Sequence, residues 1–484
     1  MNPLHMHQNT GQARNPLVRL GTASRLALVV VMSTMLGCSE GERAPDVAII
    51  VMDTVRQDHM SAFGYERPTT PQLEKLQARS ASFPRAWSTS AWTVPAHASI
   101  LTGLYSAGHR ATQENWTLDP ALDTLAEILG RRGYQTAAVI GNGMLSAERN
   151  FGQGFAQYVE IFRGGPRGQG SQAVRDSKAV DEIDSLLAYA ILSRPLFLFV
   201  NLIGPHSPYD SPRDQFVSDP SLELIDNHWL DYYRGVRTLS EAELQHLTER
   251  YDGELIEVDA WLGQIVESLD RYRGLEDMLL VVTSDHGENF GDHGHMDHVF
   301  SLHESLTRVP LVVHYPPLFE PGSEDLRPAQ LLDVFATALS VAGVDPSTYG
   351  AQGRDLSSPA DPERSLLLEL YRPEQAIGRA IRNAEPDVRL RLERWNHPLN
   401  AVVQGDWKLI VRGNGERELY DLANDPTEQN SLASDAAQAD RVARLELELE
   451  RLRERFGAAA GEGTEHVEAN EETQRAMRAL GYNE

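Results

Sequence analysis

The segment Ser284–His298 concentrates side chains that can bind a metal ion or move protons. It holds four histidines and four acidic residues in fifteen positions. A lone histidine beside an apolar run is more often structural than a ligand, and an acidic loop is often plain solvated surface. The density of both types, together with two glycines just before His295, favours a loop shaped around a divalent metal.

Further candidate ligands stand where apolar runs end. Asp53 closes the run Asp46–Asp53, His206 lies shortly after Leu196–Leu202, and the pair Asp285-His286 closes the run that starts at Met278. Near-continuous apolar runs of this length are typical of central strands in a parallel sheet. Ligands of such sheets bind at the carboxyl ends of the strands, so we expect a shared site there.

The elements between these runs are mainly helical. Asp123 can cap a helix that carries Leu125 and Leu129, and Tyr251–Tyr272 has apolar residues at helical spacing. Arg308–His314 is a fourth strand candidate. The alternation of strands and helices predicts an α/β fold over residues 46–362, with a central mostly parallel sheet sandwiched by helices.

The pattern changes in the last quarter of the chain. Short strand candidates, Ala401–Arg412 and Arg417–Leu422, flank a hairpin signal at Gly413–Gly415. One apolar helix face follows, at Val442, Leu445, Leu449 and Leu452. Residues 363–456 are therefore expected to form a small C-terminal antiparallel β and helix subdomain, and residues 457–484 a flexible tail.

Composition excludes several classes of protein. The 484 residues are 41% hydrophobic, which rules out a mainly disordered chain. Asp and Glu number 70 against 44 Lys and Arg, a net charge of −26, which argues against a nucleic-acid partner. The single cysteine, Cys38, allows no internal disulfide and no cysteine-rich zinc site.

The first 37 residues have the features of a secretory signal. They contain no Asp or Glu, carry Arg14, Arg19 and Arg25, and then continue as an apolar run too short to span a bilayer. A buried strand or helix is the alternative. The ending Met35–Cys38 resembles a bacterial lipoprotein signal, which implies Cys38 as the lipid-bearing first mature residue, a linker over 39–45, and an exported protein anchored in the cell envelope. The mature chain would then carry 41 − 70 = −29 charges.

Several segments resemble, in the same order, motifs of the sulfatase family within the alkaline phosphatase superfamily. The resemblance runs from about Asp46 to the end of the chain. The segments are Ile49–His59, Pro68–Leu73, Phe83–Trp87, Thr93–Gly103, Phe197–Tyr209, Ser284–Glu288, Leu419–Pro426 and Leu480–Tyr482. The resemblance implies an alkaline-phosphatase-like fold and an ester hydrolase.

Carried over residue by residue, the family motifs assign roles to the candidate ligands. Asp53, Asp285 and His286 would hold a metal, with the Thr93 hydroxyl as a further contact of the ion, and His97 would belong to the catalytic residues. The transferred group or its leaving oxygen would contact His206 and His298. The motif also implies an oxygen contact for Asn142, although an asparagine that caps its own loop is an equally good interpretation.

The departures from the family pattern bear on the chemistry. Sulfatases oxidise a Cys or Ser to formylglycine in a Cys/Ser-X-Pro-X-Arg pattern, whereas this chain has Thr93 at the first position and His97 at the last. Thr54 replaces the second of two paired Asp residues. His286 stands where the family has Asn, and His298 where it has Lys. Formylglycine is therefore not expected.

An ordinary threonine favours phosphate over sulfate esters. A threonine phosphate can be hydrolysed, whereas an alcohol cannot release sulfate by collapsing to an aldehyde. The residue set resembles threonine-using phosphodiesterases and phosphoethanolamine transferases. We therefore expect cleavage of phosphate mono- or diesters by Thr93 through a covalent intermediate. The ligands favour one divalent metal, zinc or manganese, with calcium as the alternative. A second metal would need an Asp at the position of Leu202.

Other functions stay open at this stage. The alternatives are a sulfatase in the strict sense, a membrane-side phosphoethanolamine-type transferase, and a non-catalytic binding protein. The substrate is expected to be a small-molecule, glycan or lipid ester. The segments Phe162–Ser177 and Asp214–Asp231 are candidate loops over the site that could select it, or plain surface loops. Oligomeric state cannot be inferred from the sequence.

Overall fold

The computed structural model describes residues 43–163, 172–222, 229–359, 361, 363–457 and 469–479. The expected signal, Cys38 and most of the linker lie outside these residues, as does part of each candidate loop. Ala44 onward forms one compact unit. No helix within the described ranges is long and apolar enough to cross a membrane.

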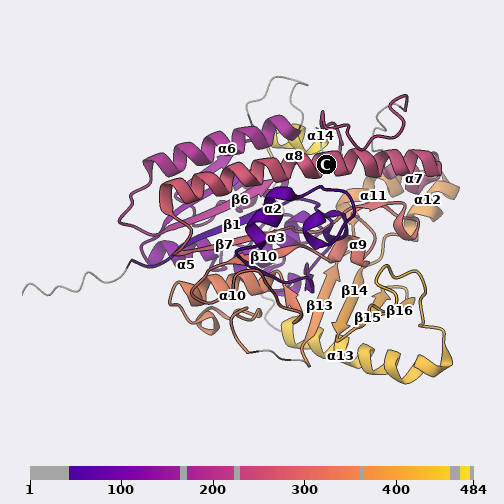
Figure 1. Ribbon diagram of the computed structural model, residues 1–484. Helices are drawn as coiled ribbons and strands as arrows, with labels where there is room; N and C mark the ends of the chain where they lie inside the picture. The colour runs from indigo at the N-terminus through magenta and orange to yellow at the C-terminus, as the bar shows by residue number, and fades with distance from the viewer. Residues whose placement is uncertain are drawn as a thin grey trace, which may run out of the picture. The chain divides into compact units, whose positions relative to one another are not determined.

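An eight-stranded sheet forms the centre of the unit (Figure 1), in the order β11-β2-β10-β7-β1-β6-β4-β5. The middle strands β7, β1, β6 and β4 are parallel, and β10 is antiparallel to β7 and β2. The expected mostly parallel α/β sheet is confirmed. The strands are β1 (Asp46–Met52), β2 (Ala81–Ser82), β4 (Gln135–Ile140), β5 (Gln157–Glu160), β6 (Leu196–Leu202), β7 (Met278–Thr283), β10 (Leu311–His314) and β11 (Ser323–Glu324).

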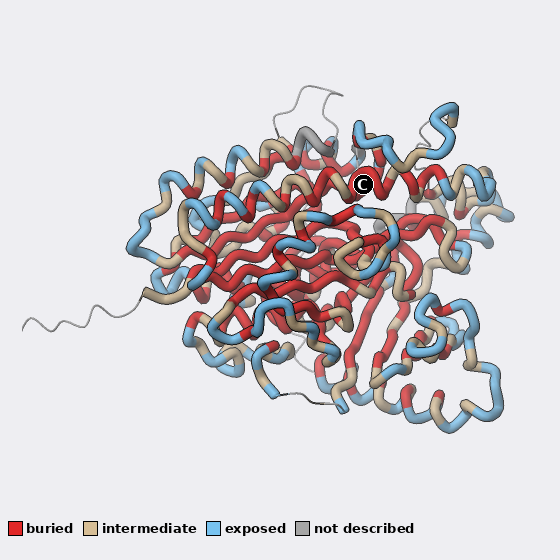
Figure 2. The backbone as a smooth tube through the Cα atoms, viewed as in Figure 1, coloured by how far each residue is buried: buried red, intermediate tan, exposed pale blue. Residues whose placement is uncertain are grey.

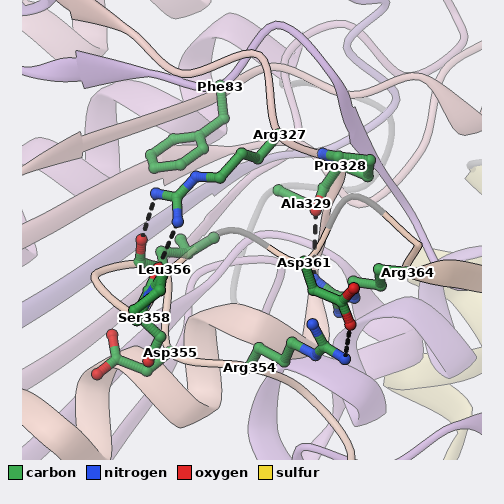
Figure 3. Close-up of a pocket in the computed structure, with 11 residues that line it drawn as sticks. Phe83, Arg327, Pro328, Ala329, Arg354, Asp355, Leu356, Ser358, Asp361 and Arg364 are labelled. Carbon is green, nitrogen blue, oxygen red and sulfur yellow. Dashed lines mark hydrogen bonds and ion pairs between the residues drawn. The ribbon is translucent and has the colours of Figure 1, made fainter. Parts of the chain in front are cut away.

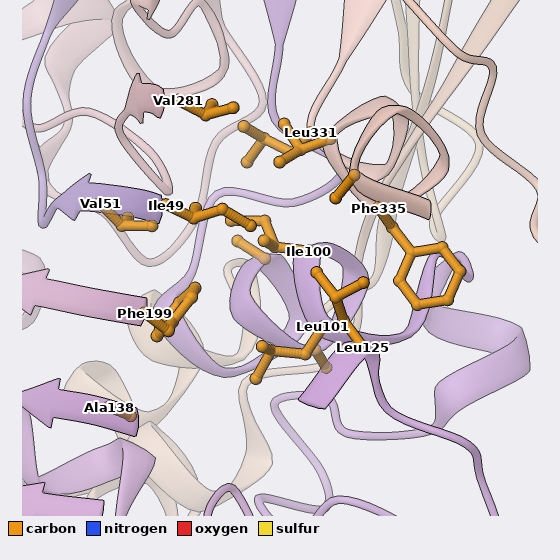
Figure 4. Packing of buried hydrophobic residues seen from close by; sticks show 14 of the residues in the cluster. Ile49, Val51, Ile100, Leu101, Leu125, Ala138, Phe199, Val281, Leu331 and Phe335 are labelled. Carbon is orange, nitrogen blue, oxygen red and sulfur yellow. The ribbon is translucent and has the colours of Figure 1, made fainter. Parts of the chain in front are cut away.

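Helices cover both faces of this sheet because its strands are apolar on both sides. Alternate residues of β1 belong to different cores: Val47, Ile49 and Val51 to one, Ala48 and Ile50 to the other. The first core is closed by α3 (Thr93–Thr102), α5 (Leu125–Arg131) and α10 (Leu332–Val341), as Figure 4 shows. The second is closed by α2 (Pro71–Gln77), α6 (Gln172–Tyr189) and α8 (Glu241–Arg273). Buried backbone runs through the whole centre (Figure 2).

Two helix starts differ from the sequence expectation. The α5 cap is Thr124, whose side chain forms a capping box with Glu127, while Asp123 instead pairs with Arg131. The long helix α8 starts at Glu241, ten residues before the expected Tyr251, because Ser240 and Glu243 form a second capping box.

A smaller four-stranded antiparallel sheet follows, in the order β13-β14-β15-β16. Its strands are β13 (Ser365–Leu370), β14 (Leu399–Gln404), β15 (Trp407–Arg412) and β16 (Arg417–Asp421). Helix α13 (Ala439–Gly457) packs on it through Val442, Leu445, Leu449 and Leu452. The expected antiparallel sheet and helix are confirmed, and β15 and β16 turn at Gly413–Gly415.

The remaining elements are short. They are the strands β3 (Ala86–Trp87), β8 (Asn289–Phe290), β9 (Met296–Asp297) and β12 (Ala329–Gln330), the helices α4 (Ser106–His109), α7 (Trp229–Arg234), α9 (Glu304–Thr307), α11 (Glu374–Asn383) and α12 (Pro386–Glu393), and several 3₁₀ turns. Ile377 of α11 and Leu392 of α12 pack into the core of the large sheet, although both helices lie within the expected C-terminal subdomain.

The end of the chain departs from the expected flexible tail. Helix α14 (Glu471–Ala479) packs through Ala476 and Met477 into the first core of the large sheet. Met477 has no exposed surface. The apolar positions Ala476 and Met477 were too few to predict this helix from the sequence, so the tail expectation is wrong for residues 469–479.

Candidate active site

The parallel strands bring the predicted residues to one edge of the sheet. Asp53 follows β1, Asn142 follows β4, His206 follows β6, and Asp285 and His286 follow β7. These four strands are neighbours, and each of the five side chains has no exposed surface. The carboxyl edge of the sheet is therefore a buried polar site.

Three of these residues form a cluster that fits a metal ion. One ligand atom each from Asp53, Asp285 and His286 lies within 4.8 Å of the other two. Among the described residues, Asp53 Oδ1 and Asp285 Oδ2 are buried and have no hydrogen-bond partner. Burial and the neighbouring Asp53 raise the pKa of Asp285 well above its usual value. Two buried carboxylate oxygens without hydrogen-bond partners, beside the imidazole of His286, form a set of ligand atoms that suits a divalent cation.

His286 presents its ligand nitrogen to this cluster. Its Nδ1 lies 2.9 Å from the Gly287 carbonyl, to which it donates, so the Nε2 lone pair faces inward. Nε2 lies 3.3 Å from Thr93 Oγ1 and 3.3 Å from Asp285 Oδ2. Burial, with the neighbouring His298, holds the pKa of His286 well below its usual value, so the ring is neutral.

Two asparagines hold Asp53 in place. Asn142 Nδ2 and Asn201 Nδ2 donate to Asp53 Oδ2 over 2.9 and 3.1 Å. Asn142 Oδ1 accepts from the Met144 N–H at 2.9 Å, so Asn142 also caps its own loop. Sequence reasoning missed Asn201, although a polar residue inside the apolar run of β6 was a signal for it.

Thr93 is the first residue of α3 and is fully buried. The first-turn N–H groups of a helix point away from its body and favour negative charge near them. His97 lies one turn further, where its Nδ1 donates to the Thr93 carbonyl at 2.9 Å and its Nε2 is 3.3 Å from Asn201 Nδ2. Burial lowers the pKa of His97. His97 therefore fixes the position of the Thr93 backbone through a buried hydrogen bond.

Two further predicted histidines join the site. The ring of His298 lies 5.2 Å from that of His206 and 4.5 Å from that of His286. His298 Nδ1 faces Asp297 Oδ1 at 3.0 Å and Glu288 Oε1 at 3.2 Å. Although burial opposes the charged ring, these two carboxylates raise the pKa of His298 to about 9. His298 is thus a cation at neutral pH, as the Lys that it replaces would be.

Glu288 and Asp297 were not assigned a role from the sequence. Both are buried, and Glu288 Oε2 also accepts from the Tyr209 hydroxyl at 3.0 Å. Their signal was their place in the segment rich in His and acids. Leu202, where a second metal site would need an Asp, is buried in the core instead. Thr54, at the missing carboxylate position, has a left-handed φ of 57°, and its hydroxyl has no hydrogen-bond partner among the described residues.

A small cavity of about 40 Å³ shares no residue with this site (Figure 3). Its arginines are neutralised: Arg354 pairs with Asp361 at 2.6 Å, and Arg364 pairs with Asp333 at 2.6 Å. Arg327 donates to backbone carbonyls across the cavity and to Asp325. Because none of its lining residues belongs to the buried polar site, we do not assign catalysis to this cavity.

Comparison with known proteins identifies the class. The family model "Sulfatase" matches residues 45–344, more than half of the chain, so the protein belongs to the sulfatase family. Members are ester hydrolases that bind a divalent metal, and the chain is accordingly an enzyme acting on ester bonds.

Individual relatives are distant but extend over most of the chain. The arylsulfatase of Clostridium perfringens is 22% identical, over 82% of this chain and 92% of that protein. A structure solved with its substrate D-glucosamine-2-N,6-O-disulfate has a TM-score of 0.68 at 21% identity, covering 86% of this chain and 99% of that one. The phosphonate monoester hydrolase of Agrobacterium radiobacter has a TM-score of 0.66 at 21% identity, covering 85% and 96%. The alkaline-phosphatase-like fold is thereby confirmed.

Proposed function

We propose that this sulfatase-family enzyme cleaves phosphate mono- or diesters with Thr93 as the nucleophile. The observation that carries the proposal is the placement of a buried threonine hydroxyl 3.3 Å from His286 Nε2, beside two carboxylates with uncompensated oxygens. The only cysteine of the chain is Cys38, so no cysteine can supply formylglycine here.

The first step is attack by Thr93 Oγ1 on phosphorus, in which the hydroxyl proton is released to water, an Oγ1–P bond forms and the bond from phosphorus to the leaving alcohol breaks. Asp53, Asp285 and His286 would hold a divalent metal, whose positive charge would favour the alkoxide form of a nearby hydroxyl. The first turn of α3 adds partial positive charge at the same place. Asn142 and Asn201 keep the Asp53 carboxylate oriented, and His97 fixes the backbone of Thr93.

The two remaining histidines have complementary roles. His298, held as a cation by Asp297 and Glu288, neutralises charge on the phosphoryl oxygens and donates a proton to the leaving alcohol. His206 donates its Nδ1 proton to the Ser207 carbonyl at 3.0 Å, which orients its ring beside that of His298. His298, neutral once it has protonated the leaving alcohol, accepts a proton from the water that releases phosphate from Thr93, and so regains its charge. General acid or base catalysis of this kind contributes roughly 10²- to 10⁴-fold.

Phosphate is favoured because the second half of the reaction is feasible. Water can attack the phosphorus of a threonine phosphate, and phosphoryl transfer depends mainly on positioning and charge neutralisation. A sulfated threonine would have to be cleared by slow attack at sulfur. The similarity to a phosphonate monoester hydrolase is compatible with phosphorus chemistry on this fold. The similarity to arylsulfatases keeps the strict sulfatase as the second candidate.

We further propose that zinc or manganese occupies the metal site. An imidazole nitrogen in a donor set favours these ions over calcium, which prefers oxygen ligands. We also propose that the protein is exported and anchored by a lipid on Cys38. The basic, acid-free start and the sole cysteine after Leu36-Gly37 support this location.

The test is a panel of aryl esters that share one leaving group: a phosphate monoester, a phosphate diester and a sulfate ester. Thr93→Ala should abolish turnover of the phosphoesters, whereas Thr93→Ser should keep appreciable turnover because the hydroxyl remains. Ser90→Ala removes another fully buried hydroxyl from the same segment and should leave turnover close to that of the parent. Efficient sulfate ester turnover with phosphoesters untouched would instead establish the strict sulfatase.

A further inference from the structure

The chain enters the domain at the end of the sheet opposite the catalytic residues. Asp53, Asn142, His206 and Asp285 all follow the carboxyl ends of parallel strands, whereas Ala44 directly precedes the amino end of β1. A seven-residue strand such as β1 is about 23 Å long. The catalytic site therefore lies on the order of 20 Å from the point of entry.

Exposed apolar side chains gather at this entry end. At the end of α6 and in the turn to β6, Tyr189, Ile191 and Leu192 are 89%, 52% and 65% exposed. Scattered exposed apolar residues are normal in soluble proteins, but three among four consecutive residues form a patch. Tyrosine, with an apolar ring and a polar tip, suits the boundary between lipid and water.

The turn that carries these side chains is firmly held. Gln135, the first residue of β4, donates to the Ile191 carbonyl and accepts from its N–H, both at 2.9 Å. The Arg194 guanidinium donates to the Gly133 carbonyl at 2.9 Å. Because its backbone is bonded to the end of the sheet (left side of Figure 1), the turn presents its apolar side chains to the surroundings as a fixed group.

A fourth exposed apolar residue, Leu318, lies on the other side of β1. It follows β10, which is antiparallel and so ends at the amino end of β1. Leu318 is 51% exposed, and the buried Phe319 next to it anchors the turn. The sheet order places β6 one strand and β10 two strands from β1, about 5 and 10 Å away. The entry point thus lies between two apolar groups.

We propose that Tyr189, Ile191, Leu192 and Leu318, the entry-end surface, rest on a phospholipid bilayer while the catalytic end faces water. The proposal rests on the proposed lipid anchor. Cys38 precedes Ala44 by six residues, a reach of at most about 21 Å. A lipid on Cys38 would keep the entry end near the bilayer, and an apolar surface there would supply a second point of attachment.

This orientation limits the substrate class. The catalytic end would face away from the bilayer, so the site would receive phosphoesters of water-soluble molecules or of glycans that extend from the cell surface. Esters within the headgroups of the same bilayer would lie on the order of 20 Å away. The orientation thus disfavours a transferase that acts on membrane lipids.

The first experiment uses the mature chain from residue 38 with Cys38→Ala, and vesicles of the zwitterionic lipids phosphatidylethanolamine and phosphatidylcholine, because anionic lipid would repel a chain of net charge −29. The parent should sediment with the vesicles. The triple change Tyr189→Ser, Ile191→Ser and Leu192→Ser should lower the bound fraction by about tenfold or more, since apolar surface is lost from the contact. The matched control is Val236→Ser with Leu390→Ser, which are 71% and 67% exposed. They lie beside α7 and on α12, at the catalytic end, and should not change binding.

The second experiment measures orientation. Since Cys38 is the only cysteine, the Cys38→Ala background accepts a single label. A polarity-sensitive dye on Leu192→Cys should shift to the blue on vesicles and be quenched by spin-labelled lipid, whereas the same dye on Val236→Cys should not. Equal responses at both positions, or no vesicle binding by the parent, would overturn the proposal. A dimer that the triple change abolishes would assign the surface to a second copy of the chain.

The proposal and the proposed function can fail separately. The triple variant should hydrolyse a soluble phosphoester at the parent rate, because none of the three side chains belongs to the site. Vesicle binding without any phosphoester turnover would refute the function and leave the orientation standing. Efficient turnover of phospholipid headgroups by vesicle-bound protein would refute the orientation and leave the function standing.

Discussion

Replacing Asp285 by Asn should weaken metal binding while it leaves the fold intact. Asp285 Oδ1 accepts the N–H groups of Thr54 and His286 at 3.1 and 2.9 Å, and an amide oxygen can keep both bonds. Oδ2 has no hydrogen-bond partner among the described residues. The substitution therefore removes one ligand charge and little else, which makes it a specific probe of metal binding.

The size of the expected effect follows from linkage. Metal at one hundred times its dissociation constant stabilises the folded state by about 2.7 kcal/mol. The unit from Ala44 to Glu484 has 441 residues, so its unfolding entropy is about 0.9 kcal/mol per kelvin. The parent should then melt about 3 °C higher with zinc or manganese than with chelator. Asp285→Asn should lose this difference.

Differential scanning calorimetry with and without metal measures the effect directly. In chelator, the Asp285→Asn variant should be at least as stable as the parent, because the amide replaces a carboxyl whose ionised form burial and Asp53 disfavour. The control is Glu369→Gln, which changes a buried carboxyl outside the site and should leave the metal-dependent difference intact. An undiminished melting difference in Asp285→Asn would refute the assignment of the metal ligands.

Three further outcomes are expected. Burial raises the pKa of Glu369 to about 7, so its folded form holds a proton that the unfolded chain loses from about pH 4.5, and stability falls as pH rises to 7. Glu369→Gln should therefore have a higher free energy of unfolding than the parent at pH 8, by up to about 3 kcal/mol, and an equal one at pH 4, in a pH series of thermal unfolding. His298→Gln should lower kcat for phosphoesters by roughly 10²-fold or more while the metal content, read by elemental analysis, stays unchanged. Cys38→Ala should remove the lipid from the mature protein, read as a loss of mass by intact-mass spectrometry, and an unprocessed N-terminus in the cytoplasm would contradict export.

The central strands were predictable because burial on both faces leaves a clear trace in the sequence. The runs at β1, β6 and β7 are apolar at nearly every position, and a polar residue of the site follows each of them within a few positions. The two-residue strands β2 and β11 gave no such trace, since so few positions carry no periodicity. The start of α8 could have been found, because Ser240 and Glu243 have the spacing of a capping box.

The sequence indicates which residues form the site better than it indicates which hydrogen bonds those residues make. The motif resemblance alone indicates that Asp53, Thr93 and His298 belong to one site. It could not predict that Asn142 and Asn201 would share one oxygen of Asp53, because that contact depends on the register between β4 and β6.

The charge of His298 was equally inaccessible to sequence reasoning. It depends on Asp297 and Glu288 lying on the same side of the ring, which the folded loop alone determines. The replacement of the family's Lys by His298 therefore keeps the positive charge at this position, although the sequence alone suggests that the charge is lost.

The covalent state of Thr93 is the central claim, and mass spectrometry of the peptide that contains it is the most direct test. The purified protein would be mixed briefly with a slowly hydrolysed, isotopically labelled phosphoester, quenched in acid and digested. We expect unmodified threonine before mixing and one labelled phosphoryl group on Thr93 afterwards, absent in Thr93→Ala. An oxidised residue at position 93, or multiple turnovers with no label ever trapped on Thr93, would contradict the account.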